Sequence, residues 1–90
     1  MGKHNSHKQI INRLKRARGH LDHVIKMIED EKPCVDVAQQ IHAVNKAVLN
    51  AKQTLIKDHI DHCLDPDHFK NKQSIKDSIE EFKEITKYLS

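Results

Sequence analysis

The sequence predicts an all-α fold: a three-helix protomer, with two long helices and one short, in a single domain over residues 1–90. Two glycines and two prolines leave long stretches without a helix breaker, and charged residues make up 32% of the chain, which is typical of helical proteins. Apolar residues recur every three or four positions, the spacing of one helix face. A chain this short, with no Trp and two Phe, buries little surface alone, so we expect an oligomer.

The first helix is predicted to start near Ser6, which forms a capping-box pattern with Gln9, and to end before Pro33. Its apolar face consists of Ile10, Leu14, Ala17, Leu21, Val24 and Ile28. Gly19 interrupts this helix at a cost of about 1 kcal/mol relative to Ala. We therefore expect Gly19 to mark a close approach to another helix.

The second helix is predicted to follow Pro33, which fits a first helical turn, and to end at Asp65-Pro66-Asp67. Its apolar face consists of Ile41, Val44, Val48, Ala51 and Leu55. A shorter terminal helix is indicated by Ile75, Ile79, Phe82, Ile85 and Leu89. No apolar stretch has the length of a membrane span or a signal sequence, so we expect a soluble, cytoplasmic protein that does not bind membranes.

Ligand-type side chains extend both ends of the apolar face of the second helix. Cys34 lies seven residues before Ile41, His59 lies four residues after Leu55, and Cys63 lies one turn further. Cys34 and His59 are 25 residues apart, or about 37 Å along one helix, and cannot share a metal ion within one chain. Over that distance the helix returns to nearly the same face, within about 20°.

Two such helices, paired antiparallel about Ala47 and Val48, would bring Cys34 of one chain to His59 and Cys63 of the other. A two-fold pairing creates two equivalent sites. The alternative is a kink near Asn50 that folds the helix back and closes the site within one protomer.

Two thiolates and one imidazole form a soft ligand set that favours Cu(I), with Zn(II) as the competitor. Additional ligands could come from His4, His7 and His62, and the two N-terminal histidines would shift the preference towards Ni(II) or Co(II). Other interpretations are a buried, purely apolar role for Cys34 and a Cys34–Cys63 disulfide. We interpret the remaining histidines as solvated or packing residues; they are His20, His23, His42 and His68.

Positive charge is concentrated in the first twenty residues, which contain no Asp or Glu. The candidates for phosphate contacts are Lys8, Arg13, Lys15, Arg16 and Arg18. A solvated helix face explains the same cluster, and the sequence contains no helix-turn-helix or zinc finger. The basic residues by themselves are therefore only a hint of nucleic-acid binding.

Three stretches resemble the copper-sensitive operon repressors, the CsoR/RcnR/FrmR-like family of bacterial regulators. They are Asn12–Asp22, Cys34–Val37 and His59–Cys63, with Gln40-Ile41 and Ala43-Val44 between them. The likeness is close over about residues 6–64, and the Cys34, His59, Cys63 spacing is that of the copper-sensing branch.

The resemblance implies a metal-homeostasis regulator rather than an enzyme. It implies a homotetramer, a dimer of dimers, that represses transcription from operator DNA until Cu(I) binds between subunits. It also implies a glutamate close to the metal ligands, which Glu80 or Glu81 would supply.

Alternatives within the family are Ni(II)- or Co(II)-responsive and formaldehyde-responsive repressors. Copper-sensing members often carry Tyr where this chain has Pro33. Nickel and cobalt sensors have an N-terminal His, and His4 of this chain lies near that position but not at it. Formaldehyde sensors have an N-terminal Pro, which Gly2 does not match. Persulfide sensors lack the His equivalent to His59. Outside the family, a metal-storage or chaperone protein would explain the cysteines but not the arginines.

Overall fold

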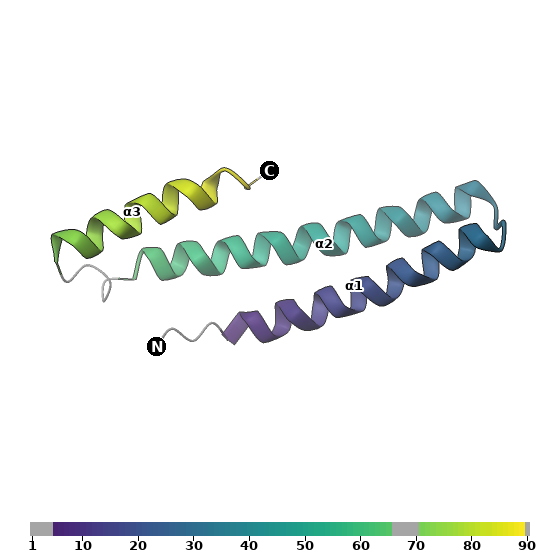
Figure 1. The fold of residues 1–90 in the computed structure, drawn as a ribbon, viewed down its shortest axis with the longest axis horizontal. Coiled ribbons are helices and arrows are strands. Elements are labelled where there is room, and N and C mark those ends of the chain that lie inside the picture. Colours follow the sequence, from purple (N-terminus) through teal and green to yellow (C-terminus); the bar gives the residue numbers. More distant parts are fainter. Residues whose placement is uncertain (1–4, 66–70, 90) are drawn as a thin grey trace. The chain divides into compact units, whose positions relative to one another are not determined.

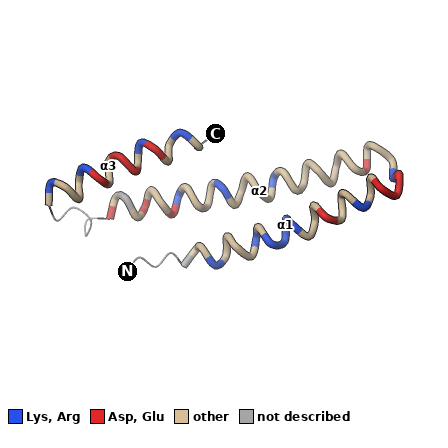
Figure 2. Tube along the Cα trace, in the orientation of Figure 1, with Lys and Arg blue, Asp and Glu red and all other residues tan. Residues whose placement is uncertain are grey.

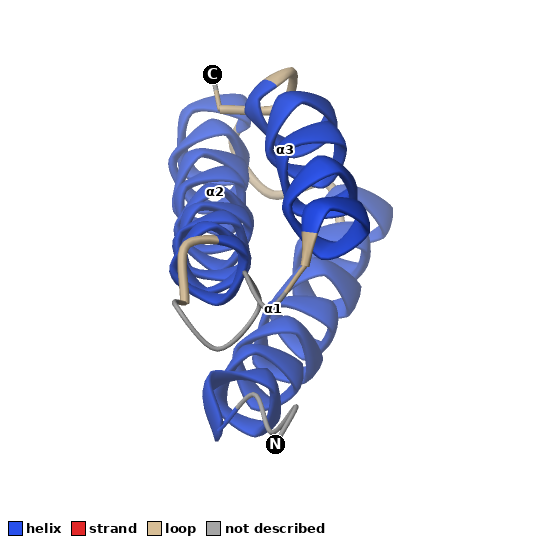
Figure 3. Ribbon diagram, turned by 90° about the vertical axis from the view of Figure 1, so that its left-hand side faces the viewer, coloured by secondary structure: helices blue, strands red, loops and turns tan. Residues whose placement is uncertain are grey.

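A computed structural model describes residues 5–65 and 71–89, apart from the side chains of Asn5 and Cys63. These residues form α1 (Asn5–Glu29), α2 (Cys34–Cys63) and α3 (Lys72–Thr86), without a strand (Figures 1 and 3). The prediction of two long helices and a short one is confirmed. Contacts divide the chain into units 1–52 and 53–90, with α2 continuing through the boundary, and the single domain over 1–90 stays a prediction. None of the described helices is long and apolar enough to cross a membrane.

In the first unit, α1 and the adjoining part of α2 form an antiparallel hairpin (Figure 1). Its buried residues recur every seven positions in each helix: Ile10, Ala17 and Val24 in α1, and Val37, Val44 and Ala51 in α2. Val24, Val37 and Val44 form one cluster, and Met27 packs against it. A seven-residue repeat is typical of helices that cross at a shallow angle, so a narrow seam of small and medium side chains holds the hairpin together.

The apolar faces predicted from the sequence are only half covered within the hairpin. In α1, Leu14, Leu21 and Ile28 remain 43%, 47% and 56% exposed, and in α2, Ile41 and Val48 remain 48% and 44% exposed. We call these five residues the outer apolar face; Leu55, 40% exposed, continues the stripe along α2. Each apolar stripe is wider than the contact with one neighbouring helix, so half of it is left for another surface to cover.

The turn between α1 and α2 is a Schellman motif with Glu31 at the position that usually holds glycine. The amides of Glu31 and Lys32 donate to the carbonyls of Ile28 and Met27 at 3.0 and 2.9 Å, which are the two bonds of that motif. Glu31 has φ of 56°, a left-handed conformation that costs a non-glycine residue about 1–2 kcal/mol. The Pro33 carbonyl then accepts from the amide of Val37 at 3.1 Å, so α2 begins directly after Pro33.

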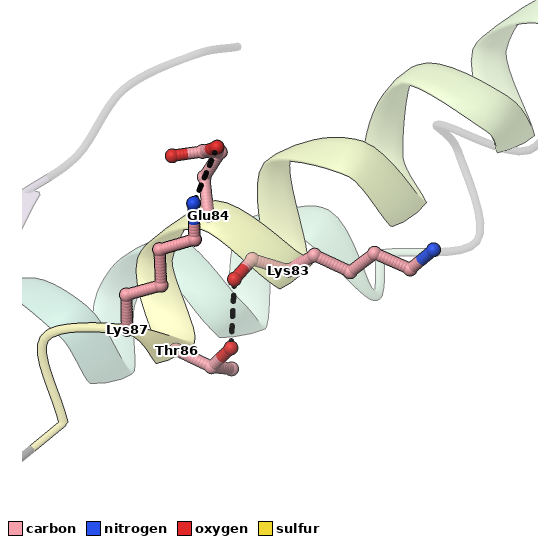
Figure 4. A network of polar contacts seen from close by, with 4 residues as sticks. All are labelled: Lys83, Glu84, Thr86 and Lys87. Atoms are coloured by element: carbon pink, nitrogen blue, oxygen red, sulfur yellow. Dashed lines mark hydrogen bonds and ion pairs between the residues drawn. The ribbon is translucent and has the colours of Figure 1, made fainter.

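In the second unit, α3 turns back beside the last turns of α2 (Figure 1). The side chain of Asn71 caps α3 by accepting from the amide of Ser74 at 2.8 Å. Near the other end, Thr86 donates to the carbonyl of Lys83 at 2.8 Å, and the ammonium of Lys87 lies 3.1 Å from the carboxylate of Glu84 (Figure 4). These local contacts define the ends of α3, yet α3 has no buried residue.

Val24→Ala is expected to lower the free energy of unfolding by about 2 kcal/mol, because it deletes buried methyl groups and leaves a cavity in the seam. Leu21→Ala, in the outer apolar face, should instead weaken association between copies and leave the hairpin itself intact. Urea unfolding followed by circular dichroism at several protein concentrations distinguishes the two effects. If Leu21→Ala lowered the free energy of unfolding as much as Val24→Ala, at every protein concentration, the division of the stripe into inner and outer halves would be wrong.

Candidate metal centre and basic surface

Cys34 is an exposed thiol at the first position of α2. The Pro33 carbonyl starts the helical ladder of α2, and this fixes Cys34 at the helix N-terminus. An open pocket of about 520 Å³ adjoins Cys34, lined by Ile28, Val37, Ala38 and Ile41 together with Glu31 and Lys32 of the turn. The thiol therefore lies beside an apolar depression at the end of the hairpin and is not enclosed in its core.

His59 lies beside α3, where its Nε2 is 3.8 Å from Oε2 of Glu81. The two side chains are 32% and 59% exposed. This distance is too long for a hydrogen bond, and the contact becomes an ion pair when the ring is protonated. Of the two glutamates singled out by the family resemblance, Glu81 is the one in this contact, and Glu80 is directed about 100° away around α3.

The other predicted ligands are distributed along the chain. Cys63 ends α2, and its side chain lies outside the described residues. His62 is half-buried near the same end of α2, and His7 is exposed in the first turn of α1. His4 falls outside the described residues. His59 and Cys63 are four residues apart and so share one face of α2, whereas Cys34 is at the opposite end of that helix.

The described side chains of residues 5–65 and 71–89, which do not include that of Cys63, assemble no metal site within one chain. No three His, Cys, Asp or Glu among them gather around a common point. The alternative of a break near Asn50 is also not found, since α2 is one continuous helix of 30 residues. A site that uses residues from both ends of a continuous helix of this length would need a second chain.

The residues predicted to contact phosphate all lie on α1, and all are exposed: Lys8, Arg13, Lys15, Arg16 and Arg18. Figure 2 shows these basic residues along the first part of α1 and acidic residues at the turn that follows it. Asp22 is the first acidic residue of α1. A polyanion that lies along this part of the helix therefore meets positive charge throughout.

One contact between the helices was not predicted from the sequence. His20 Nε2 lies 2.6 Å from Gln40 Oε1 in a part-buried position, so the ring N–H donates to the amide oxygen. His20 follows the buried Ala17 by three residues, and Gln40 follows the buried Val37 by three, so the two occupy equivalent positions of the seven-residue repeats. The shared spacing is the sequence signal from which this contact could have been predicted. The hydrogen bond holds the His20 ring towards α2.

Sequence comparison relates this geometry to known regulators. A family model described as metal-sensitive transcriptional repressor matches residues 6–89. The copper-sensing transcriptional repressor CsoR of Bacillus subtilis (strain 168) is 38% identical over 101 residues, which cover 97% of this chain and 99% of the relative. The protein of the same name from Mycobacterium ulcerans (strain Agy99) is 43% identical over 53 residues, 59% of this chain and 45% of the relative.

A solved structure has the same fold. The nickel-responsive transcriptional regulator InrS superposes with a TM-score of 0.77 at 26% sequence identity, covering 92% of this chain and 91% of that one. The family model extends across all three helices, so the match includes both the cysteines and the basic part of α1. The chain belongs to the metal-sensitive transcriptional repressors, a family of regulators rather than enzymes.

Proposed function

We propose that this protein is a Cu(I)-responsive repressor that binds operator DNA without metal and releases it when Cu(I) binds between two chains. The observation that carries the proposal is the position of Cys34 and Cys63 at the two ends of the continuous helix α2. In an antiparallel α2 pair centred near Ala47 and Val48, Cys34 meets His59 and Cys63 of the partner subunit. The copper-sensing repressors among the relatives support the choice of metal.

The donor set fits Cu(I). Thiolates are soft ligands that select Cu(I), and two of them with one imidazole make a low-coordinate site, whereas Zn(II) usually takes four ligands. The exposed Cys34 and the partly exposed His59 are both open to a second chain. Glu81, 3.8 Å from His59, is suited to accept the second ring N–H of His59 and so to orient the ring for metal binding.

The outer apolar face supports assembly. Val48, 44% exposed, lies at the proposed two-fold centre, and Ile41 lies two turns before it on the same stripe. A contiguous apolar surface on a small protein usually marks an interaction surface, so burial of this face would drive the pairing. The described part of α3 leaves Ile75 and Ile79 38% and 48% exposed, a second apolar surface suited to joining dimers into a tetramer.

Induction requires metal and DNA to oppose one another. Cys34 begins the helix that packs against α1, so a displacement of Cys34 towards the partner subunit would change the packing of α1, which carries Arg13 and Arg16. A coupling free energy of about 1–3 kcal/mol corresponds to about a 5–150-fold change in affinity. By reciprocity, operator DNA would weaken Cu(I) binding by the same factor.

A nickel-responsive repressor is the second candidate, because the structural neighbour InrS is nickel-responsive. Ni(II) accepts imidazole ligands readily, and His62, next to the proposed site, could join His59. The operator would then be released by Ni(II) and retained with Cu(I).

The inducer is tested by fluorescence anisotropy of the reduced protein on its own upstream DNA, titrated anaerobically. Cu(I) is expected to lower operator affinity by at least about fivefold, and Zn(II) is expected to have little effect. Ni(II), Co(II) and formaldehyde are titrated in parallel. Release by Ni(II) alone would favour the second candidate, and release by formaldehyde alone would exclude both metals as the inducer.

The intersubunit site is tested with a mixed oligomer of Cys34→Ala and His59→Ala chains. Each variant alone lacks a ligand in both sites of its dimer, whereas a mixed dimer has one site with Cys34, His59 and Cys63 intact. Cu(I) competition with a chelator should therefore recover about half of the wild-type high-affinity sites per mixed dimer. If mixing recovers none, the ligands do not come from two chains.

The basic surface is tested with Arg16→Ala. Loss of a phosphate contact should weaken operator binding and lower the slope of log affinity against log salt by about 0.9 per contact, with Cu(I) affinity unchanged. Lys76→Ala is the matched control, because it removes one exposed positive charge from α3. Equal slopes for the wild type and Arg16→Ala would move the DNA contact away from Arg16.

A further inference from the structure

Gly19 lies on an exposed part of α1, where the space that a side chain would occupy is free of other atoms of this chain. Apart from the backbone of its own helix and its chain neighbours, no heavy atom comes within 4 Å of the position that a Cβ would take. The expected close approach of another helix to Gly19 is thus not found within the described part of the chain. Glycine weakens an exposed helix relative to alanine, so the packing of this chain gives no reason for glycine here.

Three of the four nearest neighbours of Gly19 on the helix surface carry charge. The positions three and four residues away hold Lys15 and Arg16 on the N-terminal side and Asp22 and His23 on the C-terminal side, and all four are exposed. His20, the next residue, is held towards α2 by its bond to Gln40. Gly19 is therefore a bare patch of helix with two cations on its N-terminal side.

We propose that the sugar-phosphate backbone of the operator approaches α1 most closely at Gly19, with a phosphate held by Lys15 and Arg16. This inference rests on the proposed function and assigns part of its DNA contact. Without a Cβ, the helix surface allows a phosphate to come close, where charge-assisted hydrogen bonds from the two cations are short and strong. Contacts of this kind fix the position of the protein on the duplex without reading its sequence.

Charge favours nucleic acid over a second copy of this chain as the occupant. Residues 5–21 contain five Lys or Arg and no Asp or Glu, so two copies of this surface would repel one another. Asp22 disfavours a phosphate on the C-terminal side of Gly19, and the phosphate is accordingly directed to Lys15 and Arg16.

The test compares Gly19→Ala and Gly19→Leu with the wild type, as metal-free full-length proteins, on the upstream DNA used above. Gly19→Leu should weaken operator binding at least about tenfold, which corresponds to the loss of one charge-assisted hydrogen bond, and Gly19→Ala should weaken it less. Thermal stability should be unchanged or higher, because the site has room for a Cβ and both residues favour helix over glycine. Sedimentation should report the wild-type oligomer.

Gln39→Leu is the matched control. It adds the same bulk at an exposed position of α2 whose helix neighbours are Val35, Asp36, His42 and Ala43, with no Lys or Arg among them, and it should bind operator like the wild type. Unchanged binding by Gly19→Leu, alongside weakened binding by Arg16→Ala, would overturn the inference at Gly19 and leave the proposed function intact. An altered oligomer in Gly19→Leu would assign Gly19 to a contact between copies and overturn the inference too. If the wild type itself fails to bind the DNA, the proposed function fails and this inference with it.

Discussion

The continuity of α2 is the constraint on which the rest of this protein depends. A 30-residue helix is about 45 Å long, longer than the reach of any side chain, so the Cys34 thiol at its start and the proposed ligands at its end cannot bind one ion within a chain. The proposed function therefore requires a second copy, and α2 would then provide both the metal ligands and part of the surface that brings the copies together. In this proposal, metal sensing and assembly both depend on α2.

Because each apolar stripe is divided into two halves, α2 can pack against α1 and still present an apolar surface. The inner half, centred on Val24, Val37 and Val44, closes the hairpin, while the outer half remains exposed. Because the inner seam contains no aromatic residue, the hairpin gains little stability from its own core. Burial of the outer apolar face against a second chain, as proposed, would add stability that the core of the hairpin does not supply.

The sequence alone was sufficient to predict the three helices and the positions of the candidate ligands along them. The sequence predicts the limits of α2 from Pro33 and from Asp65-Pro66-Asp67 without reference to tertiary structure. The extension of its apolar stripe to Cys34 and His59 requires only helical geometry. The sequence did not reveal which half of each stripe is buried, because a spacing of three and four residues defines a face without its partner. The sequence also did not predict the His20–Gln40 hydrogen bond, because that contact depends on the register between α1 and α2. The contact of His59 with Glu81 depends on the packing of α3 against the end of α2.

The turn at Glu31 has a consequence for how this protein can vary. Only residues 30–33 separate α1 from α2, and the buried positions step back by seven in α1 as they step forward by seven in α2. An insertion or deletion of one residue here would rotate the faces of α2 by about 100° relative to α1 and so separate the outer apolar residues of α2 from those of α1. Replacement of Glu31 would not rotate α2 relative to α1, and glycine at this position would relieve the strain of its left-handed backbone. Among descendants of this sequence, the length of the turn should be preserved far more strictly than the identity of its residues.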